Sequence, residues 1–538
     1  MKVQSLEASR LGPLAHAMVK FGDLTVFVGP QATGKSILLQ FLKLLVDTGP
    51  TLAEMKRQGL EWDKKVGTFL DSFLGEGMSS VWREDESRLA VNEEVVHLED
   101  LVKRQRKTKE SLFFIPAQRV LTLGKGWPRT FSDYSPGDPF VVRDFSEKIR
   151  RLMELGLGRA ESLFPQTRRL KAQERVLLQE SVFAGFTLEV DQYGAQKRLV
   201  LRTSPGAPPL PFMVWSAGQR EFVPLLLGFY WLLPPTKSAR RGSVRWVVIE
   251  ELEMGLHPQA ISVVLLLVLD LLSRGYRVCL STHSPHVLDL VWALSVIRNQ
   301  DADQKFLLQL LDIKPTQQMK TLATAVLKKE IRVYYFDGFT HETRNISELD
   351  PGNDDPGVAG WGGLTDFSGR AADVVADVIS QSKGARIPMR FQAAVVGTEG
   401  LSAACCAGLQ AIDPADRARI RSQESRRLRG SVHLDRALRD DHPNAARWDY
   451  EIGRALDKRN DQIHWVEVHP AASHHVQDVI EKHRWLRDWL RGSAPLLDAM
   501  HAEYIWLASG RVSLQKNSPQ RRLIAASGIR FVGEHLVI

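Results

Sequence analysis

One octet, residues 29–36, constrains the fold of this 538-residue chain more than any other segment. It lies between an apolar run at 24–28 and a helix-like apolar run at 37–42. A glycine loop that joins a strand to a helix presents backbone N–H groups and a helix N-terminus to an anion, as in a phosphate-binding P-loop. We therefore predict an ATP site, with Lys35 on the phosphates and Ser36 on Mg²⁺. The predicted nucleotide-binding residues are Gly29, Pro30, Gln31, Ala32, Thr33, Gly34, Lys35 and Ser36.

A second requirement of a P-loop ATPase is an acidic pair at the end of an apolar strand. Residues 246–251 read Trp-Val-Val-Ile-Glu-Glu and meet it. We predict that Glu250 holds Mg²⁺ through water and that Glu251 polarises the attacking water.

The chain is too long for a single hydrophobic core, so we expect more than one domain. Strand-like and helix-like segments alternate at 246–249, 258–273 and 276–280, which predicts a mostly parallel sheet covered by helices. Near residue 385 the composition changes and becomes rich in Arg, Trp and His. We predict an α/β ATPase domain over 1–380, a linker over 381–388 and a smaller α/β domain over 389–538.

Charge and cysteine content indicate which partners and which cellular compartment the chain is suited to. The formal net charge of +8 is compatible with a nucleic-acid partner and equally with an ordinary basic enzyme. The three cysteines cannot form a disulfide framework, which favours a reducing compartment. The most apolar stretches are too short to span a bilayer. We therefore expect a cytoplasmic protein without a membrane partner.

Four further segments extend the pattern around the octet and the acidic pair. They are 115–119 (Ile-Pro-Ala-Gln-Arg), 215–221 (Trp-Ser-Ala-Gly-Gln-Arg-Glu), 252–258 (Leu-Glu-Met-Gly-Leu-His-Pro) and 279–285 (Cys-Leu-Ser-Thr-His-Ser-Pro). Their order resembles that of the RecF-like and OLD-like branch of the ABC-type ATPases, although Leu252 stands where that family usually has proline. The resemblance covers about residues 1–380. It implies an ABC-type ATPase head with a helical or arm insertion within about 50–200.

The resemblance also implies roles for single residues. His283 would contact the γ-phosphate, and Gln118 would help to hold the metal. The segment with Ser216, Gly218 and Gln219 resembles the ABC signature, which caps the nucleotide of the opposite subunit. The family pattern thus implies a homodimer, or a larger assembly, in which ATP is held between two heads.

Residues 389–538 contain a second group of candidate residues. The alternating segment 463–469 predicts a strand with Glu467 and His469 on one face, and Asp449 lies at the start of a preceding strand. This pattern resembles the PD-(D/E)xK metal-dependent nucleases, with His469 at the lysine position. In that family two carboxylates, here Asp449 and Glu467, hold Mg²⁺ beside the scissile phosphate. The lysine of the family pattern would instead be supplied by Lys482, on a predicted helix at 476–490.

Other residues of this domain are less clearly assigned. Glu424 or Asp435 is a candidate further acid. His474 and His475 lie near His469, but no matching cysteine or acid spacing accompanies them, so the sequence does not favour a transition-metal site.

We therefore predict an ATP-hydrolysing ABC-type ATPase that dimerises through nucleotide and gates a nuclease-like effector acting on nucleic acid. The resemblance implies a role in anti-phage defence, with a partner protein of the defence system or a phage trigger. Two other functions stay open. One is an ATPase whose C-terminal domain is a non-catalytic module that binds a partner or an inhibitor, and the other is a RecF-like DNA repair ATPase.

Overall fold

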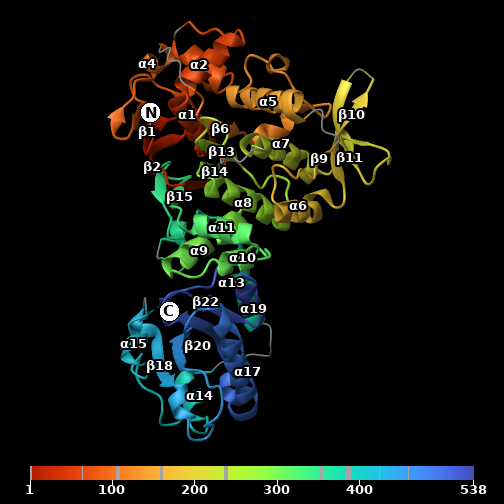
Figure 1. The fold of residues 1–538 in the computed structure, drawn as a ribbon. Helices are drawn as coiled ribbons and strands as arrows, with labels where there is room; N and C mark the ends of the chain where they lie inside the picture. Colours follow the sequence, from red (N-terminus) through yellow and green to blue (C-terminus); the bar gives the residue numbers. More distant parts are fainter. Residues whose placement is uncertain are drawn as a thin grey trace. The chain divides into compact units, whose positions relative to one another are not determined.

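A computed structural model describes residues 3–63, 65–103, 109–157, 162–194, 196–234, 240–351, 353, 355–381, 389–422, 424–457 and 460–538. The chain divides into two units, an N-terminal unit (Met1–Leu349) and a C-terminal unit (Asp350–Ile538). Figure 1 shows both, coloured along the sequence. No helix among the described residues combines the length and the apolar character needed to cross a membrane.

The N-terminal unit is built on a six-stranded sheet whose order is β16-β15-β3-β14-β13-β6. The strands from β15 to β6 are parallel, and β16 is antiparallel to β15. Every residue of β3, β13 and β6 is buried, as expected for strands covered on both faces. The bounds are β3 (Leu24–Val28), β6 (Leu112–Ile115), β13 (Trp246–Glu250), β14 (Arg277–Ser281), β15 (Ile331–Phe336) and β16 (Thr343–Asn345). The predicted α/β class with a largely parallel sheet is confirmed.

Helices connect and cover these strands. They are α1 (Lys35–Val46), α5 (Phe140–Leu152), α6 (Ala172–Leu178), α7 (Ala217–Leu232), α8 (Pro258–Ser273), α9 (Pro285–Asn299), α10 (Lys305–Leu310) and α11 (Gln317–Leu327). A second sheet, of order β2-β1-β4-β5, contains β1 (Ser5–Leu11), β2 (Leu14–Lys20), β4 (Arg88–Val91) and β5 (Glu94–Val95).

The segment expected to hold a helical insertion, about 50–200, is of mixed structure. It contains the helices α2 (Thr48–Arg57, which begins just before it), α3 (Val66–Phe73) and α4 (Leu98–Lys103), together with α5 and α6. It also contributes β6 to the central sheet and most of an antiparallel sheet of order β12-β11-β10-β9. The strands of that sheet are β9 (Ser162–Phe164), β10 (Thr187–Tyr193), β11 (Gln196–Arg202) and β12 (Leu210–Pro211).

The C-terminal unit has a five-stranded sheet of order β18-β19-β20-β21-β22. The pairs β18–β19 and β19–β20 are antiparallel, whereas β20, β21 and β22 run parallel. The bounds are β18 (Leu428–His433), β19 (Tyr450–Ala455), β20 (Asp461–His469), β21 (His501–Ala508) and β22 (Ile529–Val532). One face packs with α14 (Phe391–Val396) and α17 (Val476–Ser493) in a core that includes Trp465 and Trp506. Alternate residues such as Val466 and Ile505 form a separate core on the other face.

The boundary between the units falls after Leu349 rather than near residue 385. The reason is α13 (Asp366–Gln381), which packs on α19 (Pro519–Ala526) through a small alanine core of Ala372, Ala376 and Ala525. The ammonium of Lys516 also lies 3.5 Å from a carboxylate oxygen of Asp366. This helix therefore belongs to the C-terminal unit. Of the predicted linker, residues 382–388 lie outside the described residues.

The core of the C-terminal unit contains an unusual buried acid, Glu451 on β19. Its side chain is fully buried, and neither carboxyl oxygen has a hydrogen-bond partner in the part of the chain that the structure describes. Burial disfavours the charged form and raises the pKa of Glu451 to about 8.

This pKa makes the stability of the C-terminal unit depend on pH. Between the ordinary glutamate pKa of 4.5 and about 8, the unfolded chain releases the Glu451 proton while the folded chain keeps it, so stability falls as pH rises through this window. Glu451→Gln removes this titration. We expect the variant to gain stability relative to the wild type between pH 5 and pH 8, measured by urea unfolding followed by tryptophan fluorescence.

Glu481→Gln is the matched control, because Glu481 is exposed on α17. Its free energy of unfolding should match that of the wild type at pH 5 and at pH 8. If Glu451→Gln changes the free energy of unfolding by the same amount at pH 5 and pH 8, the Glu451 carboxyl is not neutral in the folded chain.

Candidate functional site

The candidate nucleotide site lies where four neighbouring parallel strands end. In the register of the sheet, Phe27 of β3 pairs with Ser281 of β14, and Ser281 pairs with Glu250 of β13. β6 lies on the other side of β13 in parallel, so its carboxyl end is at the same edge. The octet, the His283 segment, the acidic pair and the segment after β6 therefore meet at one edge. This is the place where open α/β sheets bind ligands.

The glycines of the octet are required by the path of the loop. Gly29 has φ 137°, and a Cβ there would lie 2.4 Å from the carbonyl oxygen of Phe336. Gly34, which precedes α1, has φ 91°, and a Cβ would lie 2.7 Å from a side-chain carbon of Leu14. The loop can hold this conformation only without side chains at these two positions.

Lys35 is buried and bends over the loop. Its ammonium donates to the carbonyl oxygens of Gly29 (2.8 Å) and Pro30 (2.5 Å), and it lies 3.3 Å from Oγ1 of Thr33. Burial lowers the pKa of Lys35 to about 8, and the nearby charge of Glu251 acts in the opposite direction. A bound phosphate would offer this ammonium a charged acceptor in place of carbonyl oxygens.

Glu250 is the most deeply buried acid of the site. Burial raises the pKa of Glu250 to about 7, while the Ser36 side chain and the Ala117 backbone N–H act to lower it. The Ala117 nitrogen donates to Oε2 at 3.2 Å, and Oε1 is buried without a hydrogen-bond partner among the described residues. A buried carboxylate oxygen beside a serine hydroxyl matches the oxygen ligands that Mg²⁺ prefers. The residues present therefore fit the predicted cation.

Glu251 faces the site from a strained backbone position. It has φ 45°, and its N–H donates to the carbonyl oxygen of Ser281 at 3.0 Å. Its carboxylate lies 3.8 Å from Nε2 of His283 and is one-third exposed. Burial and the nearby charge of Lys35 both lower the pKa of His283. His283 is therefore neutral at neutral pH and can donate one hydrogen bond.

Two residues that the sequence reasoning left unassigned hold these groups in place. Oε1 of Glu253 accepts from Oγ1 of Thr282 (2.9 Å) and from the backbone N–H of His283 (2.6 Å), so it positions the His283 segment. Arg119 is fully buried and donates to the carbonyl oxygens of Glu250 and Glu251, each at 3.0 Å. The only sequence signal for either was its place in the segments that resemble the ATPase family. Gln118, next to Arg119, is exposed.

The signature segment is not joined to this P-loop. Ser216 caps the N-terminus of α7, where its Oγ accepts from the Gln219 backbone N–H at 3.2 Å. Gly218 packs so closely on the loop after β13 that a Cβ would lie 3.0 Å from the carbonyl oxygen of Gly255. Among the described residues, no hydrogen bond or ion pair connects 216–219 with 29–36. The structure thus brings the octet together with Glu250, Glu251 and His283, but without the signature.

A second cluster forms in the C-terminal unit around Glu467. Tyr450 pairs with Val466 in the antiparallel register of β19 and β20, which places Asp449 opposite Glu467. Oδ2 of Asp449 accepts from the Val468 backbone N–H at 2.8 Å. Lys482 of α17 forms an ion pair with Oε1 of Glu467, and its Nζ lies 3.9 Å from Oδ1 of Asp449. The three predicted residues Asp449, Glu467 and Lys482 therefore converge.

The electrostatics of this cluster are those of closely spaced buried charges. Burial and the neighbouring charge of Glu467 raise the pKa of Asp449 to about 8. Burial alone would lower the pKa of Lys482, but Glu467 and Asp449 raise it above its ordinary value. Oε2 of Glu467 is buried without a hydrogen-bond partner in the described part of the chain. Two neighbouring carboxylates, one with an oxygen that lacks a hydrogen-bond partner, match the oxygen ligands that a divalent cation such as Mg²⁺ prefers.

The other candidate residues of this domain lie differently. Nδ1 of His469 is 3.4 Å from Oε1 of Glu467, so this histidine adjoins the cluster. Asp435 pairs with Arg439 and Arg447, and its charge acts on Asp449. Glu424 is half exposed and forms an ion pair with Arg427.

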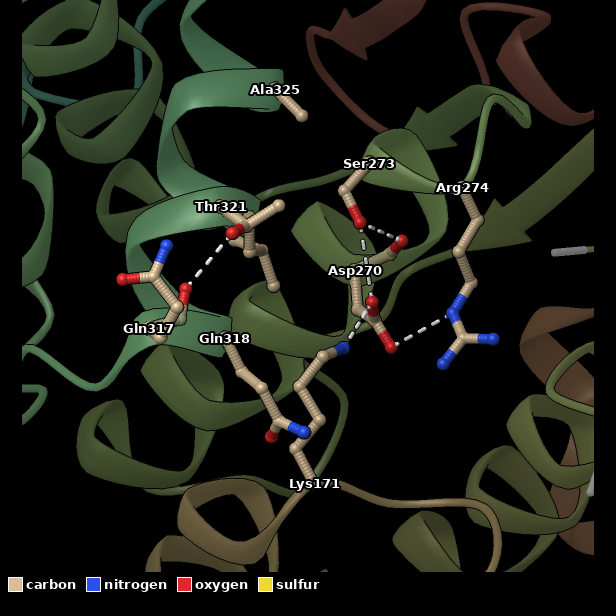
Figure 2. A pocket seen from close by; sticks show the side chains of 9 residues that line it. Lys171, Asp270, Ser273, Arg274, Gln317, Gln318, Thr321 and Ala325 are labelled. Atoms are coloured by element: carbon tan, nitrogen blue, oxygen red, sulfur yellow. Dashed lines mark hydrogen bonds and ion pairs between the residues drawn. The ribbon is translucent and has the colours of Figure 1, made fainter. Parts of the chain in front are cut away.

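A separate pocket of about 370 Å³ lies between α8 and α11 in the N-terminal unit (Figure 2). Lys171 and Arg274 both pair with Asp270 within it. Because Lys171 precedes α6 and Asp270 belongs to α8, this network fastens the segment before α6 to α8.

Comparisons with known proteins bear on the N-terminal unit. A family model for an AAA domain, whose description names the AbiEii toxin of a type IV toxin–antitoxin system, matches residues 143–289. That range contains the signature segment, the acidic pair and His283. A search of curated proteins finds no match.

Solved structures similar to the chain include three heads of SMC proteins. One is the head bound to the C-terminal winged-helix domain of ScpA, with 10% identity, a TM-score of 0.31, and coverage of 64% of this chain and 96% of that chain. The head from Thermotoga maritima has 12% identity, a TM-score of 0.23, and coverage of 54% and 92%. The Pyrococcus furiosus head, with an extended coiled coil and bound to the C-terminal domain of ScpA, has 9% identity, a TM-score of 0.25, and coverage of 53% and 91%.

The family match over residues 143–289 and the geometry at the edge of the sheet together support a P-loop ATPase domain in the N-terminal unit. The nucleotide and its metal are the expected ligands of such a domain.

The buried Arg119 gives a test of how the acidic pair is held. Arg119→Met removes the donors to the carbonyl oxygens of Glu250 and Glu251 and leaves both acceptors without them. We expect a loss of stability on the order of 2–6 kcal/mol, since each of the two unsatisfied buried groups costs about 1–3 kcal/mol. Differential scanning calorimetry of the full chain should show a lower unfolding temperature for the N-terminal unit.

Arg57→Met is the control, because Arg57 is exposed on α2 of the same unit. Its effect should stay within about 0.5 kcal/mol. Equal unfolding temperatures for Arg119→Met and the wild type would exclude a supporting role for Arg119.

Proposed function

We propose that this protein is an ATPase that dimerises through bound ATP and thereby gates a metal-dependent nuclease-like effector in its C-terminal unit. The observation that carries the ATPase part is the convergence of the octet, Glu250, Glu251 and His283 at the carboxyl ends of adjacent parallel strands.

Each residue of the nucleotide site has a distinct proposed role. Lys35 binds the phosphates, Ser36 and Glu250 hold Mg²⁺ with Gln118 nearby, and Glu251 accepts the proton of the attacking water. His283 donates to the γ-phosphate. Mg²⁺ held by Ser36 and Glu250 would neutralise the charge that develops on the phosphates. Positioning and charge compensation account for most of the catalysis of phosphoryl transfer, and these residues supply both.

The signature supports a dimer because it lies apart from the P-loop of its own chain. Ser216 and Ala217 are exposed, whereas Trp215 and Gln219 on either side of them are buried. Met213 and Val214, which precede Trp215, are 73% and 63% exposed, an apolar pair that a second subunit would cover. In the proposed dimer, Ser216, Gly218 and Gln219 contact the ATP that is bound by the partner.

Three substitutions test the ATP-dependent dimer. Lys35→Ala should abolish ATP binding, and Glu251→Gln should lower turnover by at least about 10² while it preserves ATP binding, because a general base contributes about 10²–10⁴. Ser216→Arg should bind ATP yet remain monomeric. Equilibrium ATP binding, phosphate release and light scattering after gel filtration measure the three properties.

Ser204→Arg is the control for the added bulk and charge, since Ser204 is exposed in a neighbouring loop. It should dimerise like the wild type. If Glu251→Gln hydrolyses ATP at the normal rate, Glu251 is not the general base. If Ser216→Arg still forms an ATP-dependent dimer, the signature segment does not contact the nucleotide of the partner.

The nuclease part of the proposal is supported by the cluster of Asp449, Glu467 and Lys482. The two carboxylates would hold Mg²⁺, which supplies Lewis-acid activation of the scissile phosphate. Lys482 would stabilise the negative charge that develops during cleavage. An antiparallel trio of strands followed by α17 and the parallel strand β21 provides the frame for these residues. The net charge of +8 is compatible with nucleic acid as the substrate.

Glu467→Gln tests the nuclease-like site. We expect it to abolish Mg²⁺-dependent cleavage of DNA or RNA, because it removes one negative charge from the metal site, and to leave ATP hydrolysis intact. The measurement combines a gel assay on single- and double-stranded DNA and RNA with the phosphate-release assay.

Glu481→Gln makes the same chemical change at an exposed position of α17 and should cleave like the wild type. If Glu467→Gln leaves both cleavage and cellular protection unchanged, the C-terminal unit is a binding module that captures a partner or an inhibitor.

Anti-phage defence in the cytoplasm is the setting that we propose for these activities. The description of the family that matches residues 143–289 names a toxin of a type IV toxin–antitoxin system, which supports a setting of this kind. A trigger or partner protein would then set the state of the ATPase.

A further inference from the structure

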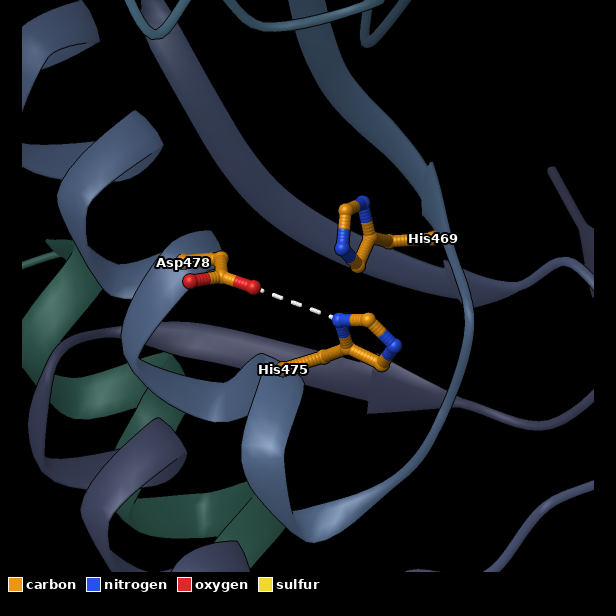
Figure 3. A group of neighbouring side chains, drawn as sticks. All are labelled: His469, His475 and Asp478. Carbon is orange, nitrogen blue, oxygen red and sulfur yellow. Dashed lines mark hydrogen bonds and ion pairs between the residues drawn. The ribbon is translucent and has the colours of Figure 1, made fainter.

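Three metal-ligating side chains gather at the end of β20 and the start of α17, outside the acidic cluster. They are His469, the last residue of β20, His475, directly before α17, and Asp478 in its first turn. One ligand atom from each lies within 4.8 Å of the other two. Figure 3 shows the two imidazole rings close together, with the Asp478 carboxylate directed at His475, and the ring planes are 80° apart.

We propose that His469, His475 and Asp478 bind a transition-metal ion such as Zn²⁺, and that this ion fastens β20 to the first turn of α17. The inference stands apart from the proposed nuclease activity, because it is measured by metal binding alone.

The first argument is the orientation of His469. Its Nδ1 lies 3.4 Å from Oε1 of Glu467, whereas its Nε2 is buried without a hydrogen-bond partner in the described residues. A buried nitrogen left unpaired costs free energy. Metal-ligating histidines characteristically donate the other ring N–H to a carboxylate, which fixes the tautomer and leaves a lone pair for the metal. The Glu467 carboxylate lies beside Nδ1 of His469, which leaves Nε2 as the nitrogen that would bind a metal.

The second argument is the spacing of the other two ligands. Nδ1 of His475 lies 3.2 Å from Oδ2 of Asp478, a separation short enough for one ion to contact both atoms. The rings of His469 and His475 are 4.9 Å apart between centroids. Small rotations of the side chains would bring all three donors to a common centre, since Asp478 and His475 lie at the surface end of the helix and are partly exposed.

The donor set determines the class of metal. Two imidazole nitrogens and one carboxylate oxygen suit Zn²⁺, Co²⁺ or Ni²⁺, whereas Mg²⁺ prefers oxygen ligands only. Three protein ligands leave one position of a tetrahedral ion for water. The site therefore differs in chemistry from the oxygen-ligand sites at Glu250 and at Asp449 with Glu467.

The site would also position the lysine of the acidic cluster. Residues 475, 478 and 482 share one face of the helix, because they are three and seven positions apart. An ion that joins His469 to His475 and Asp478 therefore fixes the turn before Lys482 against the strand that carries Glu467. His475 and Asp478 act here as positioning residues.

The experiment uses the full chain, stripped of metal with a chelator and titrated with Co²⁺ in the presence of excess Mg²⁺, which occupies the oxygen-ligand sites. We expect one Co²⁺ per chain with the visible absorption of tetrahedral ligation, and its displacement by Zn²⁺. His475→Ala and Asp478→Asn should each weaken Co²⁺ binding at least about tenfold, since even outer-shell changes weaken metal binding about 10–100-fold.

His474→Ala is the matched control, because His474 is the exposed neighbour of His475 and lies outside the ligand set. It should bind Co²⁺ like the wild type. Asp478 is 58% exposed, so Asp478→Asn carries the test if His475→Ala fails to fold. The proposal is overturned if the wild type shows no tetrahedral Co²⁺ spectrum, if Asp478→Asn retains it at full affinity, or if His474→Ala weakens binding as much as His475→Ala.

Discussion

The parallel register of β3, β14, β13 and β6 is the constraint on which the nucleotide site depends. Each strand is followed at its carboxyl end by a segment that contributes to the site, and the register places those ends at one edge. A slip by one residue would turn the side chains of a strand to the opposite face of the sheet, against different neighbours. The packing of these buried strands therefore sets the position of Glu250 relative to Ser36.

Both candidate sites contain carboxylates that folding has buried without complete compensation. Glu250 and Glu467 are almost fully buried, and each has an oxygen without a hydrogen-bond partner among the described residues. Burial of a carboxylate with an unpaired oxygen is costly, so these acids lower the stability of the fold when no cation is bound. The raised pKa of Glu250 and of Asp449 expresses the same cost. A cation that binds there replaces the missing compensation, which couples ligand binding to stability.

Some of this arrangement could be predicted from the order of residues. The octet, the acidic pair after an apolar strand, and the alternation that puts Glu467 on one face of β20 are local patterns that a strand or loop obeys by itself. The convergence of Lys482 with Asp449 and Glu467 follows from the amphipathic helix that returns over the strand. The roles that we give to these residues remain proposals, whereas their positions are now described.

Other features depend on contacts between segments far apart in the chain. The strand–loop–helix of the octet, the acidic pair and the apolar strands can be derived from the order of residues alone, because backbone geometry and hydrophobic periodicity act over a few residues. That Arg119 holds the carbonyl groups of Glu250 and Glu251, and that Glu253 supports the His283 segment, is visible only in the folded chain. The same holds for the packing of α13 with the C-terminal unit and for the proximity of Asp478 to two histidines. The physical reason is that such partners are chosen by packing and burial, which bring together residues whose separation along the chain carries no signal.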